Sequence, residues 1–336
     1  MLTLPIPVFV ALILGFLMVR HTVLKDRSVL FLLLLAACVI QALVISLTQH
    51  YGVLALTIIQ PITAVAAPVF AWLTFQSAAL RPFDAKRDMF HAIGPAFTIF
   101  CTLFAPVTLD VVLPAIFAGY GVAILIRLHR EGTLPLARLE AGPLPARIWK
   151  AVAVLLILSA FSDILIAVAL GLGYSALRPL IISVFTSFTL LGIGMLSLSR
   201  DADGALDKDA EPPQIAANPS EEDTALIVRL DALMSRDRLY LDPELTLTRL
   251  ARRLHVPIKH LSAAINRANG ENVSRYVNGF RIRHACERLT AGDTVTEAML
   301  GSGFNTKSNF NREFTRVMGQ SPSAFVHANN AVNDRN

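Results

Sequence analysis

The chain has 336 residues and a formal net charge of +5, and only 16% of its residues are charged. Its mean hydropathy of +0.55 excludes an ordinary soluble protein, and its length predicts about two domains. Nearly all apolar residues precede residue 200, so the sequence predicts a membrane half followed by a soluble half. The three cysteines, Cys38, Cys101 and Cys286, show no spacing typical of a metal site or a disulfide framework. We therefore expect no metal and no cofactor.

The first half contains seven apolar runs, each near the length of about 20 residues that spans a bilayer. They cover residues 2–19, 29–48, 53–80, 89–108, 110–126, 150–170 and 177–199. The third run is over-long and holds Pro61 and Pro68, which allow a tilt, a kink or a re-entrant segment. The border between the fourth and fifth runs, at Asp110, is the least distinct. Residues 1–199 are therefore predicted to form a seven-helix transmembrane bundle that acts as a sensor domain.

The charges between these runs predict the orientation of the chain. Counted to the first residues of the next run, the links after the first, third and fifth runs hold three, three and five lysines or arginines, whereas the other links hold only Arg178. Because positive residues favour the cytoplasmic side, we expect a multi-pass protein of the bacterial inner (cytoplasmic) membrane. Its amino terminus would lie outside and residue 200 in the cytoplasm. The first run does not read as a cleavable signal peptide, because no Lys or Arg precedes it and no small-residue cleavage site follows.

Asp163 lies near the middle of the sixth run, where a carboxyl group is costly and usually functional. One interpretation is a ligand contact or switch residue in a sensor. The other is a protonated packing contact that pairs with a polar group such as Gln41, Gln60 or His91. The chain contains no zinc-protease, nucleophile-elbow or phosphate-loop motif, so no enzyme activity is predicted.

Residues 200–223 differ in composition from both halves. Between Asp201 and Asp223 there are eight acidic residues and one basic residue, Lys208, together with several Pro, Gly, Ala and Ser. This composition is typical of a flexible, solvated tether, whose negative charge would be repelled by DNA. The segment is the clearest domain boundary in the sequence.

The soluble half begins with a predicted helix-turn-helix. From residue 224 to the end, Lys and Arg number 16 and Asp and Glu number 10, and a basic domain suggests nucleic acid or anionic lipid as partner. After an entry helix over 226–234, Thr246 caps a second helix, and a turn at 255–257 leads to a third helix over 258–268. That third helix is expected to enter the major groove with an outer face formed by Lys259, Ser262, Ala263 and Asn266.

A second helix-turn-helix follows a longer helix over 273–289, whose flanks carry Arg275, Arg281, Arg283 and Arg288. A capping box from Thr294 to Glu297 starts a short helix. The stretch 303–321 then predicts a basic helix with an apolar stripe, a cap at Asn305 or Thr306 and a stop at Gly319. The side chains expected to reach base edges or phosphates are Lys307, Ser308, Asn311 and Arg312.

These residues resemble the carboxy-terminal DNA-binding domain of the AraC/XylS family of transcription regulators, over about residues 226–325. The strongest part runs from Gly303-Phe304 through Ser308-Asn-Phe310-Asn-Arg312-Glu-Phe314 to Gly319-Gln-Ser321-Pro322. The resemblance implies two recognition helices in successive major grooves, about 34 Å apart. The sequence departs from the family at His255, where Gly is usual, and at Pro257, where Ser is usual, so a side-chain cap on the first recognition helix is lost.

Together these features predict an all-α chain with a transmembrane domain at 1–199, a linker at 200–223, a double helix-turn-helix domain at 224–330 and a tail at 331–336. The leading hypothesis is a membrane-anchored transcription regulator whose partners are double-stranded DNA, the lipid bilayer, a second copy of the chain and an unknown signal. An alternative makes the spans a transporter or intramembrane enzyme with a regulatory tail. A third hypothesis is that the linker is cut and the soluble half diffuses free.

Overall fold

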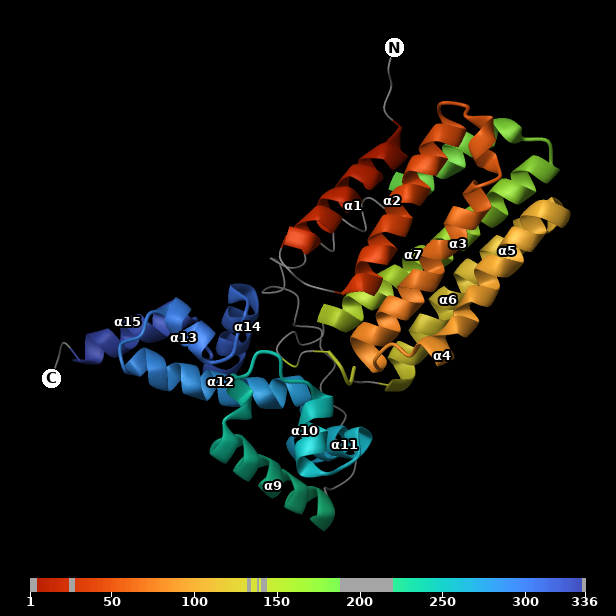
Figure 1. Ribbon diagram of the computed structural model, residues 1–336. Helices are drawn as coiled ribbons and strands as arrows, with labels where there is room; N and C mark the ends of the chain where they lie inside the picture. The colour runs from red at the N-terminus through yellow and green to blue at the C-terminus, as the bar shows by residue number, and fades with distance from the viewer. Residues whose placement is uncertain are drawn as a thin grey trace. The chain divides into compact units, whose positions relative to one another are not determined.

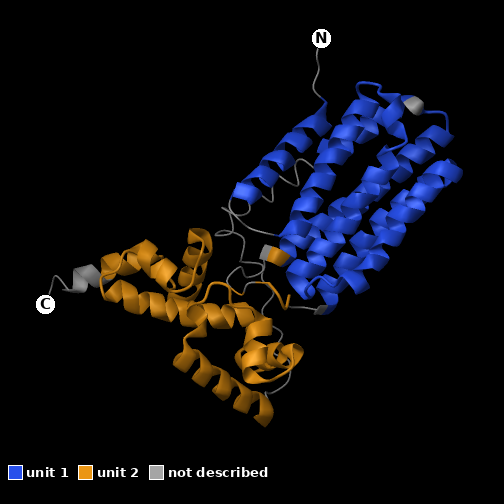
Figure 2. Ribbon diagram, viewed as in Figure 1, with its two compact units in different colours: residues 1–132, 146–195 blue, residues 133–145, 196–336 orange. Residues whose placement is uncertain are grey.

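The computed structural model describes residues 5–23, 28–131, 134–137, 139, 144–187 and 220–333. The chain divides into two compact units (Figure 2): Met1–Gly132 with Ala146–Met195 form the first, and Thr133–Pro145 with Leu196–Asn336 form the second. Regular structure in the described ranges consists of helices and includes no strand, which confirms the all-α prediction.

The first unit is a set of long apolar helices in which α2 packs against α1 and α3, and α3 packs against α5 and α6 (Figure 1). The bounds are α1 Ile6–Val23, α2 Val29–Gln49, α3 Gln60–Phe75, α4 Ala85–Asp88, α5 Ile93–Phe104, α6 Leu109–Glu131 and α7 Leu144–Gly171. Short 3-10 turns or a π-turn lie at Leu54–Thr57, Gln76–Leu80, Met89–Ala92, Pro106–Thr108 and Ser175–Leu177.

Five of these helical stretches are long and apolar enough to cross a membrane: Ile6–Val23, Val29–Gln49, Gln60–Leu80, Pro106–Arg130 and Pro145–Gly171. The fourth predicted run falls short of that length because α5 has 12 residues and is preceded by a 3-10 turn. The seventh run starts in a 3-10 turn at Leu177 and is helical over 178–187, and its residues 188–199 lie outside the described residues. The count of seven spans therefore stays a prediction.

The groups that the sequence suggested as partners for Asp163 are bonded to other residues. Asp163 is half-buried in α7. The observed bonds join Gln41 to Thr63 at 2.6 Å, Gln60 to Thr48 at 3.1 Å, and His91 to Trp72 at 3.0 Å and to Tyr120 at 2.8 Å. The glutamine bonds link α2 to α3, as polar groups between transmembrane helices commonly do. The suggested pairing of Asp163 with these groups is not observed.

The second unit consists of α9 Glu221–Asp237, α10 Leu247–Leu254, α11 Ile258–Asn269, α12 Val273–Thr290, α13 Val295–Gly301, α14 Lys307–Met318 and α15 Pro322–Asn333. In Figure 1, α12 runs between the helices of the first and second helix-turn-helix. Helix α9 starts at Glu221, within the segment predicted as linker, and α15 extends three residues into the predicted tail, while the domain borders themselves stay predictions. The physical reason at α9 is a capping box, in which Ser220 and Asp223 each accept a backbone N–H from the other at 3.1 Å.

Helix α12 belongs to two hydrophobic cores at once. Its first half contributes Val273, Tyr276 and Val277 to the core beneath α9, α10 and α11. Its second half contributes Ile282 and Leu289 to the core beneath α13 and α14. Since one continuous helix is buried in both cores, it joins the two helix-turn-helix units as a stiff connector.

Arg281 lies on α12 where one core gives way to the other, and its burial corrects the prediction that it lies on a flank of this helix rather than on its buried side. Its side chain is fully buried. The guanidinium donates to the Tyr240 carbonyl at 2.6 Å, to the Asp242 carbonyl at 2.9 Å and to Asn278 Oδ1 at 3.2 Å. A buried charge is tolerated only when its donors are satisfied, and these carbonyls satisfy them. The bonds tie α12 to the chain just before α10.

Gly303, which precedes α14, lies against the same segment before α10 that accepts the hydrogen bonds of Arg281. Its φ is +84°, and a Cβ built there would lie 2.7 Å from the Tyr240 carbonyl oxygen and 2.8 Å from that of Leu241. The turn predicted from the sequence is thus confirmed, and only glycine fits both its backbone and its close approach.

We predict that Gly303→Ala destabilises the second unit by about 2–5 kcal/mol, because left-handed strain adds to a steric clash. Gly319→Ala is the matched control, since Gly319 also has positive φ but nothing within 4 Å of the added Cβ, and it should cost only about 1–2 kcal/mol. Pulse proteolysis of the full chain in urea would measure both. Equal losses at the two positions would contradict the close approach.

Candidate nucleic-acid interface

The first helix-turn-helix places all four predicted residues on the outer side of α11. The preceding turn contains His255 in the left-handed region at φ 57°, a conformation that glycine adopts more readily than other residues. Leu261, Ala264 and Ile265 are fully buried against α10 and α12. Of the predicted contact residues, Lys259 is exposed, and those that are half-buried are Ser262, Ala263 and Asn266. The helix therefore presents a mostly neutral face with one lysine in its first turn.

The second helix-turn-helix places Phe310 and Phe314 in the core, as the apolar stripe predicted. Lys307 is exposed, and Ser308 and Asn311 are half-buried on the other side of α14. Arg312 differs from these residues, because only 11% of its side chain is exposed. Its guanidinium donates to Asn309 Oδ1 and, at 3.4 Å, to Glu313 Oε1. Arg312 can reach a ligand only by exchanging these bonds.

The amino ends of the two recognition helices differ from those of the other helices in the unit. Five helices are capped by a side-chain oxygen that accepts a backbone N–H of the first turn, and the caps are Ser220, Thr246, Asn272, Thr294 and Ser321. The residues before α11 and α14 are Pro257 and Thr306, and neither side chain makes a capping hydrogen bond. The loss of the cap at Pro257 is confirmed, whereas the cap predicted at Asn305 or Thr306 is not made by the Thr306 side chain.

Charge divides the amino ends differently, because the capped helices α10, α12 and α15 also lack an acid in the first turn. The first turns of α9 and α13 carry acidic residues, which stabilise the positive end of a helix dipole. The first turns of α11 and α14 carry no acidic residue, and each contains a lysine, Lys259 or Lys307. A cation at this end is unfavourable for the helix itself. An uncapped, basic amino end is instead suited to an anion such as a phosphate group.

Both recognition helices are held at their carboxyl ends by arginines at equivalent positions. Arg267 in the last turn of α11 donates twice to Asp223, at 2.7 and 2.8 Å. Arg316 in the last turn of α14 donates to Glu271 and Glu313, each at 3.0 Å, and to the Arg275 carbonyl at 3.2 Å. The bidentate Arg267–Asp223 pair fixes orientation as well as adding energy, and Arg316 is held by three separate acceptors. The exposed amino ends are therefore presented from anchored helices.

Asp223 is a positioning residue, although the composition of the surrounding sequence predicted it to be one of the acids of a flexible linker. The residue is buried, and the hydrogen bond from Arg267 holds the pKa of its carboxyl well below the ordinary range. A local signal was present, because Ser220-Glu-Glu-Asp223 before an apolar run has the spacing of a capping box. The ion pair to Arg267 had no such signal.

The two helix-turn-helix units together define a DNA-binding module of the helix-turn-helix class, with two anchored recognition helices on one connector. Comparison with known families agrees: residues 250–328 match the model of a helix-turn-helix domain, and this domain is of the AraC type. The match begins within α10 and ends within α15, so it includes both recognition helices. No solved structure matches the chain.

We predict that the Asp223–Arg267 pair makes the stability of the second unit depend on pH in the acid range. A carboxyl whose pKa is lower when folded contributes stability above its unfolded pKa of about 3.9, and this contribution is lost as the pH falls further. Asp223→Asn should lower the urea midpoint at pH 5 and reduce its further fall between pH 4 and pH 2. Glu222→Gln, an exposed acid in the same turn, should behave like the wild type. Pulse proteolysis with pepsin would measure both.

We also predict that Lys307→Glu has opposite effects on stability and binding. An acid in the first turn of α14 should stabilise the helix by about 0.3–1 kcal/mol, whereas DNA affinity should fall because a phosphate is repelled. Arg236→Glu, with the same charge change on an exposed side chain of α9, should leave DNA affinity nearly unchanged. Filter binding and urea unfolding would test the pair. If Lys307→Glu bound DNA as tightly as the wild type, the assignment of this helix end would be wrong.

Proposed function

We propose that the protein is a membrane-anchored transcription regulator that binds DNA sequence-specifically through α11 and α14. The observation that carries this proposal is the contrast between helix ends in the second unit. The two helices that a helix-turn-helix inserts into the groove are the two in the described part of this unit that lack a side-chain cap, and neither carries a first-turn acid. An end that is poorly stabilised from within the protein is well placed to receive the DNA backbone.

The side chains on the outer faces of α11 and α14 suggest that some contact bases and others contact phosphates. Asn266 and Asn311 carry amides of the kind that pair with adenine in the major groove, and Ala263 offers a methyl contact to thymine. Lys259 and Lys307 lie in the first turns and are assigned to phosphates. Ser262 and Ser308 suit either role. Arg312, which is bonded to Asn309 and Glu313, is assigned to a phosphate that it would reach by partial rearrangement.

The membrane anchor rests on the five apolar helices and on the charge pattern of their links. With the amino terminus outside, the second unit would be cytoplasmic and able to meet chromosomal DNA. The first unit would sense a signal, with Asp163 in α7 as the candidate switch, and pairing of two copies would raise the effective concentration on paired sites. The transporter alternative rests on Asp163 and on the prolines of the apolar runs, and it gains no further support from the described part of the chain.

We predict that the full chain in lipid nanodiscs selects a defined sequence from random DNA, with two half-sites about one helical turn apart. The logarithm of affinity should fall linearly with the logarithm of salt concentration. In the double variant Lys259→Ala/Lys307→Ala, the slope should decrease by about 2, because each released phosphate contact contributes about 0.9.

Asn311→Ala is the companion variant, because it should relax the preference at one base pair by about 1–3 kcal/mol while leaving the salt slope unchanged. Binding without any sequence preference at physiological salt would contradict the proposed function. A reporter fused after residue 200 tests the topology separately, and a periplasmic signal would exclude a role at the chromosome.

A further inference from the structure

The segment between α6 and α7 packs in the same unit as the DNA-binding helices. Thr133–Pro145 belongs to the second unit, although it connects two helices that are candidate membrane spans (Figure 2). Residues 134–139 form a strap, of which the structure describes 134–137 and 139. The strap thus links the two halves of the chain independently of the acidic linker.

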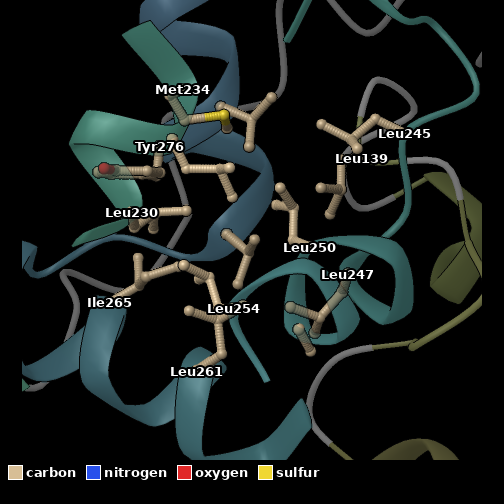
Figure 3. Close-up of a cluster of buried hydrophobic side chains, with 14 of the residues drawn as sticks. Leu139, Leu230, Met234, Leu245, Leu247, Leu250, Leu254, Leu261, Ile265 and Tyr276 are labelled. Atoms are coloured by element: carbon tan, nitrogen blue, oxygen red, sulfur yellow. The ribbon is translucent and has the colours of Figure 1, made fainter. Parts of the chain in front are cut away.

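The strap is bound to the first helix-turn-helix unit by burial and by hydrogen bonds. Leu139 is 5% exposed and is part of the first core, where Figure 3 shows it beside Leu245 and Leu250. Its N–H donates to the Leu245 carbonyl at 3.0 Å. The Pro135 carbonyl accepts the N–H of Thr248 at 3.2 Å and its hydroxyl at 2.8 Å. Both ends of the strap are therefore fixed to the chain around the start of α10.

The contacts of the strap satisfy groups that α10 cannot satisfy alone. The N–H of Thr248 is in the first turn, where no carbonyl of the same helix is available. Thr246 caps the next N–H, that of Arg249, and Pro135 provides the acceptor for Thr248. Leu139 meets the same cluster of side chains that includes Leu261 and Ile265 of α11. The strap therefore contacts the core on which the first recognition helix rests.

The connections from the strap to α6 and α7 are short. Pro135 lies four positions after Glu131 at the end of α6, and Leu139 lies five positions before Leu144 at the start of α7. Even fully extended, these connections span no more than about 14 Å and about 18 Å. A displacement of α6 or α7 beyond that reach must either carry the first helix-turn-helix unit along or pull the strap from its site.

We propose that residues 134–139 are an intramolecular docking strap through which the membrane half restrains the first helix-turn-helix unit. With the strap docked, the first helix-turn-helix unit is tethered to α6 and α7, and only the second helix-turn-helix unit is able to engage DNA fully. A rearrangement of α6 and α7 withdraws Leu139 and Pro135 and allows both units to bind. This inference rests on the proposed function, because it assigns the regulation of the same DNA-binding site.

A reversible disulfide tests the docked state in the full chain. Leu139→Cys and Leu245→Cys are combined in nanodisc-embedded protein whose three native cysteines are replaced by alanine, and a protease site in the linker separates the halves. Mild oxidation should join the two fragments, and reductant should separate them. Leu139→Cys with Leu300→Cys, an exposed position on α13 of the second helix-turn-helix, is the matched control and should not cross-link.

The same protein reports on DNA binding. Oxidised protein should bind a two-half-site DNA about tenfold or more weakly than reduced protein, because linked modules lose avidity when one is withheld. Its affinity for a single half-site read by α14 should be unchanged. Equal affinity in both redox states, or absence of the cross-link, would overturn the strap while leaving the proposed function intact. If no form bound DNA, the proposed function would fail and the strap's regulatory role with it.

A variant that breaks the strap supplies the converse test. Leu139→Asp should expel the segment from the core and raise affinity for the two-half-site DNA several-fold over the wild type. If the strap were only a part of the fold, Leu139→Asp would instead become sensitive to protease throughout the second unit and lose DNA binding. That result would overturn the inference, and the unmodified chain would serve as the reference for both measurements.

Discussion

The burial of the Arg281 guanidinium is the interaction on which the arrangement of the DNA-binding module depends. A charged group inside a protein requires several hydrogen-bond acceptors, since an unpaired one is costly. Here the acceptors are carbonyls of the segment before α10, and the Phe304 ring beside α14 lies 5.7 Å from the guanidinium carbon. A side chain on the connector α12 therefore contacts the chain next to each helix-turn-helix. These contacts fix the orientation of the two helix-turn-helix units relative to each other.

The recognition helices are stabilised from their carboxyl ends and left available at their amino ends. Arg267 and Arg316 bond to acids on other elements, while Pro257 and Thr306 provide no side-chain cap. If caps and acids were placed at the amino ends instead, they would stabilise each helix but compete with phosphate for the same N–H groups. The observed arrangement keeps the orientation of each helix fixed without occupying the surface that the ligand needs.

Sequence patterns predicted the parts of the fold that depend on neighbouring residues. The periodicity of α10, α11, α12 and α14, the capping box at Thr294 and the turn at Gly303 all follow from local rules. Three features were missed because they depend on residues far apart in the chain. Arg281 was placed on a flank, Asp223 in a linker and Leu139 in a link between spans, yet each is buried by an element more than 30 positions away. An arginine or aspartate in a sequence reads as exposed until its distant acceptor or donor is known.

The strap can restrain DNA binding because of the contacts around Arg281 that orient the two helix-turn-helix units. Leu139 and Pro135 contact only α10 and its surroundings. If the two helix-turn-helix units were joined flexibly, this contact would leave the second helix-turn-helix unit unaffected. Here α12 is buried in both cores and Arg281 ties it to the segment before α10, so the first helix-turn-helix unit cannot swivel on the second to reach its own groove while the strap holds it. Two anchored recognition helices on one stiff connector must meet successive grooves together. A restraint on the first unit is therefore a restraint on binding to any site that requires both, and a short segment between two apolar helices is sufficient to impose it.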